Sequence, residues 1–371
     1  MKIGIDVREL SIGSTGISQY TLNIINYLNK CNSKLQADYF LFTNKNYKNQ
    51  NLSENFHIII DNSFSNNTIY ENIRLPYLIK KFRIDKFFSP YYKMPFLSPA
   101  PCIITVHDIG FITFPLEFYA RSGFYRIFAR QYLKLSLKFS KKIAAVSEFT
   151  KSEIIKEFHI NPDKVSVLYN SVNICFHRNV LSEKKKQIEE LKKKYGYFIF
   201  SVSNYKPHKN IKKLVEAFEI IKKNSDLNLV LAGPENIWKK NLQKYIQEKN
   251  YDFDGRLFFS APKDNEDLSV YYAAAEMLCH PSLFEGFGLP IVEAQSCGCP
   301  VVSSPAASLA EIIGDSGIII NPDSAQDIAE KICGLYNNKI VRDGLMAKGF
   351  LNAEKYRPQK SYSEIINLLT S

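Results

Sequence analysis

Short apolar runs that alternate with helix-like stretches constrain the fold of this chain more than any other feature. The alternation occurs twice, first from residues 2–7 to residues 165–169 and again from residues 197–203 to residues 318–320. Strands that alternate with helices predict parallel sheets with helices on both faces. A chain of 371 residues also exceeds one ordinary core, so each series predicts an α/β domain of its own.

A charged segment separates the two series. Residues 173–194 lose strand character and carry two runs of three lysines. We therefore expect a first domain over residues 1–170, a second over 171–357 and a final helix within 358–371. Ligands of open α/β sheets bind at the carboxyl ends of the strands, so the residues at those ends are the candidates for a site.

Composition excludes some classes and leaves others open. Lysine and arginine number 48 against 37 acidic residues, and the net charge of +11 favours anionic partners such as nucleic acid, acidic lipid or phosphorylated substrates without choosing among them. With 45% hydrophobic and 23% charged residues, a folded soluble protein is expected, and no apolar run has the length of a membrane span. Seven cysteines without metal-ligand spacing predict reduced thiols, and the N-terminal residues predict no secretory signal.

The most specific motif follows a predicted strand. Residues 284–293 read Phe-Glu-Gly-Phe-Gly-Leu-Pro-Ile-Val-Glu, with Pro290 at the favoured first position of a helix. The carboxylates of Glu285 and Glu293 can accept hydrogen bonds from vicinal hydroxyls of a hexose or a ribose. Glycines let the backbone approach a ligand, and N–H groups near a helix N-terminus suit phosphate or sugar oxygens. The residues that supply these N–H groups are Phe287, Gly288 and Leu289. The alternative is an ordinary strand-to-helix turn with solvated acids.

Residues 201–210 form a second motif, Ser-Val-Ser-Asn-Tyr-Lys-Pro-His-Lys-Asn, which ends the first strand of the second series. A helix is predicted to begin near Ile211. Lys209 then stands close to a helix N-terminus, where the backbone already favours an anion, and it could grip a diphosphate. A solvated basic loop is the alternative.

Two strand ends in the first series carry weaker candidates. His107 ends the apolar run 103–107, which directs it toward the predicted cleft, and Asp108 follows it in a position to orient the loop or the imidazole. A structural histidine that caps a turn is the alternative. A glycine-containing loop over residues 11–16 follows the first strand, but such turns are common and this one is not a dinucleotide-binding GxGxxG fingerprint.

Together these motifs resemble a known family. Glu285 and Glu293 around Gly-Phe-Gly-Leu-Pro are similar to the signature of the retaining GT-B glycosyltransferases of family 4, and the resemblance covers nearly the whole chain. It implies an α/β fold of two facing Rossmann-like domains with parallel sheets, the acceptor side in residues 1–170 and the nucleotide-sugar side in 171–357. It further implies that the last helix, within 358–371, crosses back to the first domain and that the donor lies between the two.

The resemblance also implies roles for individual residues. His107 would hydrogen-bond the donor sugar and Glu285 would hold it, which makes these two the predicted catalytic residues. Lys209 would bind the pyrophosphate, Glu293 the ribose, and Gly16 matches the glycine that admits the donor sugar and phosphate. The remaining predicted donor contacts are Ser203, Phe287, Gly288 and Leu289. Second-tier positions, which include matches to the family's cleft-lining serine and hinge element, are Asp108, Ser147, Asn170, Asn204 and His208.

The chain departs from the family pattern at the predicted diphosphate site. Ser203 stands in place of the usual glycine and His208 in place of the usual arginine. Asn204 occupies a position that is arginine in some relatives. It is therefore open which second cationic side chain would bind the diphosphate, and Lys206 is one candidate.

The implied activity is retaining transfer of a hexosyl group from a nucleotide sugar to an acceptor hydroxyl, in bacterial surface-polysaccharide or lipopolysaccharide O-antigen assembly. Mannose from GDP-mannose is the first prediction, and rhamnosyl, glucosyl or N-acetylglucosaminyl transfer from a dTDP- or UDP-sugar is the alternative. The rivals are a non-catalytic nucleotide-sugar-binding scaffold and a GT-B epimerase or glycogen-type synthase. Because no Walker loop or Cys/His metal cluster occurs, no metal or other cofactor is expected. Nucleic acid is not an expected partner, since the aromatic residues form no base-stacking motif.

Residues 123–142 read as one helix that could contact a membrane. Arg126, Arg130, Lys134 and Lys138 recur every four residues and form a basic row with apolar residues beside it. A basic amphipathic helix can lie on an anionic bilayer, where a lipid-linked or growing saccharide acceptor would be presented. The predicted location is therefore the cytoplasm, peripheral to the inner face of the plasma membrane. The alternative is that the apolar side of the helix packs on the sheet and the basic row is simply solvated.

Overall fold

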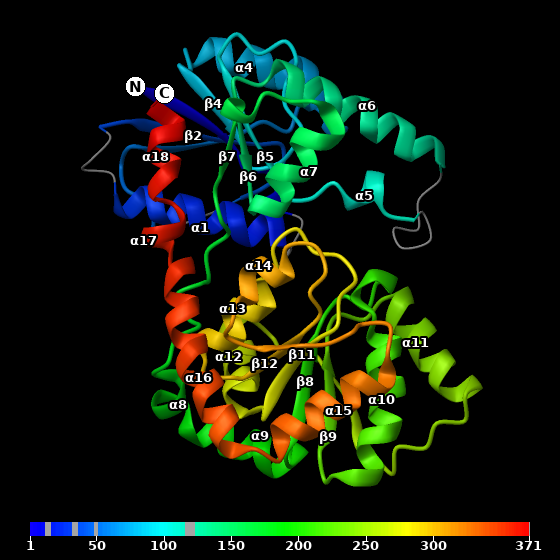
Figure 1. The fold of residues 1–371 in the computed structure, drawn as a ribbon. Helices are drawn as coiled ribbons and strands as arrows, with labels where there is room; N and C mark the ends of the chain where they lie inside the picture. Colours follow the sequence, from blue (N-terminus) through cyan, green and yellow to red (C-terminus); the bar gives the residue numbers. More distant parts are fainter. Residues whose placement is uncertain (12–15, 32–35, 48–50, 116–122, 371) are drawn as a thin grey trace. The chain divides into compact units, whose positions relative to one another are not determined.

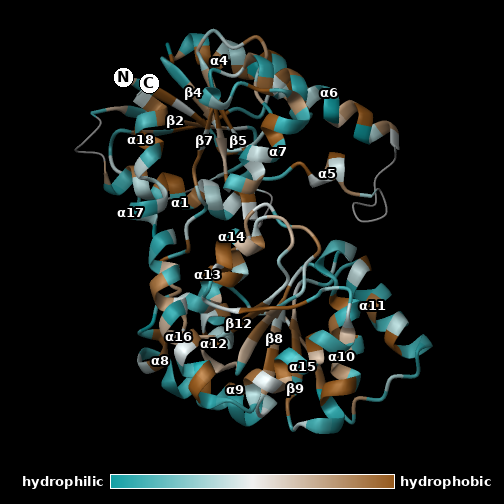
Figure 2. Ribbon diagram, viewed as in Figure 1, coloured by the Kyte–Doolittle hydropathy of each residue, from teal (hydrophilic) through white to brown (hydrophobic). Residues whose placement is uncertain are grey.

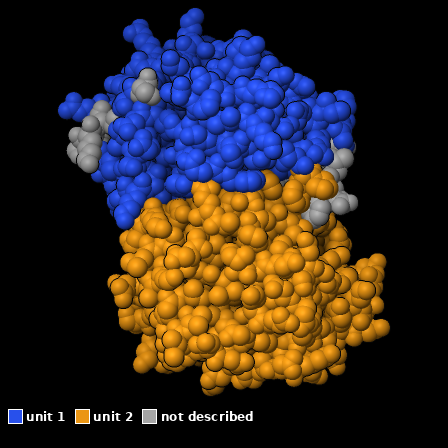
Figure 3. All heavy atoms as spheres, viewed as in Figure 1, with its two compact units in different colours: residues 1–113, 122–171, 358–371 blue, residues 114–121, 172–357 orange. Residues whose placement is uncertain are grey.

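The computed structural model describes the chain apart from residues 12–15, 32–35, 48–50, 116–122 and 371 (Figure 1). The chain forms two compact units, which Figure 3 distinguishes by colour. Unit 1 consists of residues 1–113, 122–171 and 358–371, and unit 2 consists of residues 114–121 and 172–357. Phe114 belongs to unit 2, and its ring packs 5.2 Å from that of Phe284, centroid to centroid.

Unit 1 is built on a seven-stranded sheet whose strand order is β3-β2-β1-β4-β5-β6-β7. Neighbouring strands are parallel throughout. The order of the strands along the sheet reverses direction between β1 and β4, so the loops after these two strands diverge. The strands are β1 (Lys2–Asp6), β2 (Asp38–Thr43), β3 (Phe56–Ile60), β4 (Lys86–Ser89), β5 (Cys102–Val106), β6 (Lys142–Ala145) and β7 (Val165–Val167).

Helices cover this sheet (Figure 1). The α-helices of unit 1 are α1 (Gly16–Lys30), α3 (Asn67–Ile69), α4 (Leu75–Lys81), α5 (Gly110–Thr113), α6 (Gly123–Phe139), α7 (Glu148–Phe158), α17 (Pro358–Ser361) and α18 (Ser363–Thr370). Shorter elements are the 3-10 turns η1 (Arg8–Ser11) and η4 (Pro162–Lys164) and a single π-helical turn, η2 (Tyr70–Arg74), which runs directly into α4.

Unit 2 repeats the plan with a six-stranded parallel sheet in the order β10-β9-β8-β11-β12-β13, which reverses between β8 and β11. Its strands are β8 (Phe198–Val202), β9 (Asn228–Ala232), β10 (Leu257–Ser260), β11 (Met277–His280), β12 (Val301–Ser303) and β13 (Ile318–Ile319). Its helices are α8 (Val180–Glu183), α9 (Lys185–Tyr195), α10 (Ile211–Asn224), α11 (Ile237–Glu248), α12 (Asn265–Ala274), α13 (Leu289–Ser296), α14 (Leu309–Ile313), α15 (Ala325–Tyr336) and α16 (Lys339–Ala353), with 3-10 turns η5 (Pro207–Lys209) and η6 (Glu354–Tyr356).

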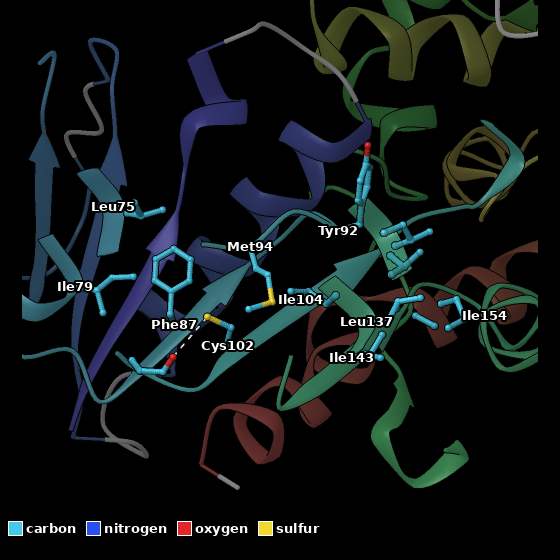
Figure 4. Close-up of a cluster of buried hydrophobic side chains, with 14 of the residues drawn as sticks. Leu75, Ile79, Phe87, Tyr92, Met94, Cys102, Ile104, Leu137, Ile143 and Ile154 are labelled. Carbon is cyan, nitrogen blue, oxygen red and sulfur yellow. Dashed lines mark hydrogen bonds between the residues drawn. The ribbon is translucent and has the colours of Figure 1, made fainter. Parts of the chain in front are cut away.

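Each sheet buries a core of its own. In unit 1, Phe87 of β4 is fully buried near Ile79 of α4, and Ile104 of β5 is fully buried near Met94 (Figure 4). In unit 2, α10 buries Leu214 and Phe218, four residues apart and so on one face of the helix, against its sheet. Figure 2 shows the consequence, with hydrophobic strands inside and hydrophilic outer faces on many helices. The predicted α/β class with parallel sheets is confirmed.

The C-terminal segment contributes to the core of unit 1. Tyr362, between α17 and α18, is fully buried, and its ring meets those of Tyr20 and Tyr27 edge-on at centroid distances of 6.0 and 5.9 Å. Its hydroxyl oxygen accepts a hydrogen bond from the N–H of Ser171 at 3.3 Å. The tail is not the single helix that the sequence predicts, because it breaks between α17 and α18.

The structure corrects one further expectation and contains helices that the sequence did not predict. Most of helix α9 lies in the charged segment 173–194, and only Ile188 and Tyr195 of this helix are buried, so its pattern is nearly all polar. The helix predicted over residues 123–142 ends at Phe139, because Lys142 begins β6. Helices α11 and α16 have no counterpart in the predicted elements.

Replacement of glycine by alanine should have opposite effects on stability at two positions. A Cβ at Gly233, which follows β9, would lie 2.0 Å from the carbonyl oxygen of Ser203, whereas one at Gly344 in α16 would meet nothing within 4 Å. Gly233→Ala must displace the segment after β8 and should lower the free energy of unfolding by roughly 1–3 kcal/mol. Gly344→Ala should raise it by about 0.5–1 kcal/mol, because alanine favours a helix. Denaturant unfolding of both variants tests this, and equal effects would contradict the packing at Gly233.

Candidate active site

The reversal of strand order in unit 2 brings two distant segments together. Lys209 lies in the turn η5 after β8, and His280 ends β11, the next strand across the sheet. Glu285 follows in the loop before α13. Ligands of open α/β sheets bind at this kind of switch point, at the carboxyl ends of the strands. The two strongest sequence motifs therefore form one site.

The centre of this site is the carboxylate of Glu285. One of its oxygens, Oε1, accepts hydrogen bonds from Lys209 Nζ at 2.5 Å, from Ser282 Oγ at 2.9 Å and from His280 Nε2 at 3.1 Å. In the described part of the chain no residue hydrogen-bonds to the other oxygen, Oε2. Glu285 is thus held by one oxygen and offers the other to a ligand.

The ion pair fixes the charge of Glu285. Burial by itself opposes ionisation, but the ammonium of Lys209 and the hydrogen bond with His280 outweigh it and hold the pKa of Glu285 well below its usual range. The side chains of Lys209 and Glu285 are 17% and 14% exposed, so water screens the pair only weakly. The site therefore presents an ionised carboxylate next to the side chain of Lys209.

Backbone contacts hold the loop that carries Glu285. Ser308 Oγ donates to the carbonyl oxygens of Glu285 and Phe287, at 2.9 and 3.0 Å. Gly288 has φ +101°, and a Cβ there would lie 2.6 Å from Leu309 Cδ2, so only glycine fits. The chain then enters α13 at Leu289, whose first turn leaves backbone N–H groups without partners within the helix.

Glu293 lies inside α13 in a different environment. Its Oε2 accepts a hydrogen bond from the hydroxyl of Tyr272 at 2.9 Å. Burial raises the pKa of Glu293 to about 7, and the Tyr272 hydrogen bond offsets only part of that rise. Unlike Glu285, this carboxyl group is without a cationic partner among the described residues, so its ionisation is poised near neutral pH.

His107 follows β5 in unit 1. Its Nε2 lies 3.0 Å from the carbonyl oxygen of Pro90, and the ring of Tyr20 packs edge-on at 4.9 Å between centroids. Burial lowers the pKa of His107 to about 4, so the ring is neutral at pH 7. Because a carbonyl oxygen only accepts hydrogen bonds, Nε2 must carry the proton, and Nδ1 is left as an acceptor.

Several other predicted residues have structural contacts. Asp108 Oδ1 accepts from the N–H of Gly110 at 2.9 Å, which orients the loop after β5. Ser147 is buried as the N-cap of α7, where its Oγ accepts from the N–H of Thr150, so it supports the helix rather than lining a surface. Asn170 is also buried, and its carbonyl oxygen accepts from Ser361 Oγ.

The segment after β8 is held by hydrogen bonds within itself and to neighbouring segments. Ser203 Oγ accepts from the N–H of Tyr205, and Asn204 Oδ1 accepts from the N–H of Lys206. His208 is only 8% exposed, so a direct contact of its ring with a diphosphate would need the turn to move. Lys209 is thus the cation of the predicted loop that the structure places in the site.

Gly16 begins α1, and a Cβ there would meet no atom within 4 Å. The protein itself does not require glycine at this position, which leaves open space for a ligand. Residues 12–15 of the predicted loop lie outside the described residues.

Four site residues lie outside the predicted motifs, namely His280, Ser282, Ser308 and Tyr272. A signal existed for His280, because it ends a strand as His107 does. Ser308 and Tyr272 follow or precede the motif by more than ten residues, and nothing in their local sequence marks them.

Within the described ranges no group of three or more His, Cys, Asp or Glu side chains is arranged to hold a metal ion. None of the helices described is both long and apolar enough to cross a bilayer.

Two units, each with a parallel Rossmann-like sheet, are the architecture of the GT-B fold. The Glycosyl transferases group 1 model matches residues 182–349, and the Glycosyltransferase Family 4 model matches residues 15–175. The chain belongs to the family 4 glycosyltransferases of GT-B fold.

Relatives and a solved structure agree with this assignment. O-antigen chain mannosyltransferase B of Escherichia coli is 29% identical over 71% of this chain and 69% of its own length. O-antigen chain mannosyltransferase RfbU of Salmonella typhimurium is 28% identical over 59% of this chain and 56% of its own. The crystal structure of Anabaena Alr3699/HepE in complex with UDP and glucose superposes with a TM-score of 0.74 at 19% identity, over 100% of this chain and 99% of that one.

The raised pKa of Glu293 predicts a pH-dependent stability. A carboxyl group whose pKa is higher in the folded chain, about 7, than its ordinary 4.5 binds its proton more tightly when folded. The free energy of unfolding therefore falls as pH rises from about 4.5 to about 7, by roughly 1–3 kcal/mol. Glu293→Gln should remove this loss, so its Tm should exceed that of the wild type at pH 8 by several degrees more than at pH 5.

Glu54→Gln, at an exposed position in unit 1, serves as the control and should follow the wild-type pH profile. Parallel Tm profiles for the wild type and Glu293→Gln between pH 5 and 8 would show that Glu293 has no raised pKa.

Proposed function

We propose that this glycosyltransferase moves a hexosyl group from a nucleoside diphosphate sugar to an acceptor hydroxyl with retention of configuration. The observation that carries the proposal is the Lys209–Glu285 pair, 76 residues apart in sequence and in direct contact at the switch point of the second sheet. An ammonium next to a carboxylate with one free oxygen suits a ligand that is anionic at one end and hydroxylated at the other. A nucleoside diphosphate sugar has both features.

Each site residue has a distinct task in this proposal. Lys209 turns from Glu285 to the diphosphate and stabilises the charge that develops on it as the bond to the sugar breaks. Glu285 keeps its contacts with His280 and Ser282 and accepts sugar hydroxyls at Oε2. Glu293 accepts the ribose hydroxyls, which favours its ionised form.

The transfer itself is proposed as a front-face displacement. The bond from the anomeric carbon to the diphosphate oxygen breaks, and the acceptor oxygen bonds to the same face of that carbon. The proton of the acceptor hydroxyl passes to the departing diphosphate oxygen, so no protein base is required. Because the sugar carries oxocarbenium character in between, the ionised Glu285 also stabilises it electrostatically.

His107 contributes as a hydrogen-bond acceptor. With Nε2–H engaged by Pro90 and the ring neutral, Nδ1 is the atom that a donor-sugar hydroxyl can reach. A neutral imidazole places no positive charge near the developing oxocarbenium ion. We therefore assign His107 to orienting the sugar rather than to proton transfer.

GDP-mannose is the proposed donor, and a saccharide in surface-polysaccharide or O-antigen assembly is the proposed acceptor. Support comes from the two relatives named as O-antigen chain mannosyltransferases. The UDP bound to the Anabaena structure keeps UDP-sugars as the alternative donor. We propose that transfer requires no metal, because Lys209 and the N-terminus of α13 supply the positive charge for the diphosphate.

Removing the charge of Glu285 or Lys209 should abolish transfer. Glu285→Gln and Lys209→Met should each lower turnover of GDP-[¹⁴C]mannose with membrane-extracted acceptor by about 100-fold or more, because both act mainly on the transition state. Glu248→Gln, which alters a surface pair in α11, should retain wild-type turnover. The assay is run with and without EDTA.

The outcomes separate the rivals. Turnover of Glu285→Gln within about three-fold of wild type would remove Glu285 from the reaction. GDP binding without transfer to any acceptor indicates a scaffold, and donor conversion without acceptor indicates an epimerase. Activity lost in EDTA and restored by Mn²⁺ would overturn the metal-free mechanism.

We also propose that α6 docks on an anionic membrane. Leu133 and Leu137 of α6 are buried in the core of unit 1, but other apolar residues of the helix stay outside it, since Phe124 is 81% exposed, Ile127 64% and Phe128 61%. Leu97, in the loop before β5, is likewise exposed at 74% and is next in sequence to Phe96, whose ring packs on Phe139 of α6. An exposed apolar surface beside basic residues is the pattern of an interfacial helix.

The basic row is smaller than the sequence predicts. Arg130 forms an ion pair with Glu157 of α7, so its charge is partly neutralised. Arg126, Lys134 and Lys138 make no ion pair with the described residues. These three would meet lipid phosphates while the phenylalanine side chains enter the acyl boundary.

Removing the apolar side chains of α6 should release the protein from vesicles. Replacement of Phe124, Ile127 and Phe128 by serine should lower co-sedimentation with phosphatidylglycerol vesicles by at least about ten-fold, because each exposed apolar group gains from leaving water. The matched control replaces Ile340 and Leu351 of α16, which are 85% and 73% exposed, by serine. Binding of the wild type should weaken with added salt.

Equal co-sedimentation of the two serine variants would contradict the docking of α6. A wild type that self-associates without vesicles, and loses this in the α6 variant only, would identify the surface as a contact between copies of the chain.

A further inference from the structure

The first sheet carries a cavity at its own switch point. β1 and β4 are neighbours where the strand order reverses, and the cavity lies at their carboxyl ends, between Asp6 and the segment from Pro90 to Lys93. Its volume is about 60 Å³, the share of roughly two water molecules. It therefore has room for a few hydroxyl groups rather than for a whole ring.

Three of the charged side chains that line the cavity hydrogen-bond to one another. The guanidinium of Arg8 donates to Asp6 Oδ2 at 2.6 Å and to Glu71 Oε2 at 2.8 Å, and its third contact is the carbonyl oxygen of Asn67 at 3.1 Å. All three charged side chains of this network are nearly buried, at 8% exposure or less. Because these groups already satisfy one another, they shape the cavity without needing a ligand.

Two charged side chains at the cavity are not satisfied in this way. Glu9 and Lys93 are half-buried, and none of the described residues hydrogen-bonds to the carboxylate of Glu9 or the ammonium of Lys93. Burial raises the pKa of Glu9, opposed by the nearby cations Arg8 and Lys93. Lys93 Nζ lies 5.8 Å from the centroid of the Tyr91 ring, so an acceptor, a donor and an aromatic surface meet here.

The charges at the cavity favour a neutral ligand. Three carboxylates, from Asp6, Glu9 and Glu71, line it against the two cations Arg8 and Lys93, which leaves a sum of −1. A phosphate or diphosphate would be repelled, whereas sugar hydroxyls can donate to Glu9 and accept from Lys93 at once.

We propose that this cavity binds the hydroxyl edge of a neutral sugar of the acceptor saccharide, with Glu9 and Lys93 as the specificity-determining contacts. The inference rests on the proposed transferase activity and extends it to the acceptor. Pro90 connects the cavity with His107, since its carbonyl oxygen holds the imidazole of His107 while the residue itself lines the cavity. The segment that orients the donor-sugar contact thus also shapes the acceptor cavity.

The test is ligand-observed saturation-transfer NMR of the full chain with methyl α-D-mannopyranoside. Wild type should transfer saturation to the sugar, and Glu9→Gln and Lys93→Met should each weaken its binding by about ten-fold, the effect of one charge-assisted hydrogen bond. Glu54→Gln and Lys80→Met, at exposed positions of unit 1, should bind as the wild type does. Inorganic phosphate at the same concentration should not displace the sugar.

Absence of saturation transfer by the wild type, wild-type binding by Glu9→Gln or Lys93→Met, or displacement of the sugar by phosphate would overturn the assignment. A thermal shift with GDP measures the donor site separately. Stabilisation by GDP without binding of the mannoside would contradict the acceptor cavity and leave the proposed donor site intact. Mannoside binding that depends on Glu9 and Lys93, without any effect of GDP, supports this inference and counts against the proposed donor.

Discussion

The reversal of strand order within each parallel sheet is the constraint on which the rest of the structure depends. Parallel strands end on one edge, and at the reversal the connections to the two neighbouring strands turn to opposite faces of the sheet, which leaves an opening. In unit 2 this opening holds Lys209 and Glu285, and in unit 1 it holds the cavity beside Glu9 and Lys93. The position of each candidate site is therefore set by the strand order of its sheet, and the side chains there determine what it can bind.

Charge pairing explains how such openings stay stable without a ligand. A lysine or a glutamate alone would be costly to bury, but each offsets the desolvation of the other. The Lys209–Glu285 pair and the Asp6–Arg8–Glu71 network both follow this rule. They differ in the atoms available to a ligand. Glu285 keeps one oxygen without a hydrogen bond from the described residues, whereas the carboxylates that flank Arg8 serve mainly to hold the guanidinium.

The strands and the principal motifs were predictable because each is a local pattern. Apolar runs bounded by turns mark buried parallel strands, and the motif containing Glu285 is specific on its own. Helix α9 was missed because it buries only two side chains and so has almost no apolar face. Contacts between segments could not be predicted: the pairing of Arg130 with Glu157, and the hydrogen bond from His280 to Glu285, depend on which strands become neighbours.

The burial of Tyr362 has a consequence for biosynthesis. The residues of unit 2 are all made before residue 358, whereas unit 1 needs Tyr362 to fill the space beside Tyr20 and Tyr27. During translation the unit that begins the chain is thus the one completed last. Once residue 357 has been made, every residue of unit 2 is present, whereas the space beside α1 in unit 1 is still unfilled. The order of folding therefore need not follow the order of synthesis.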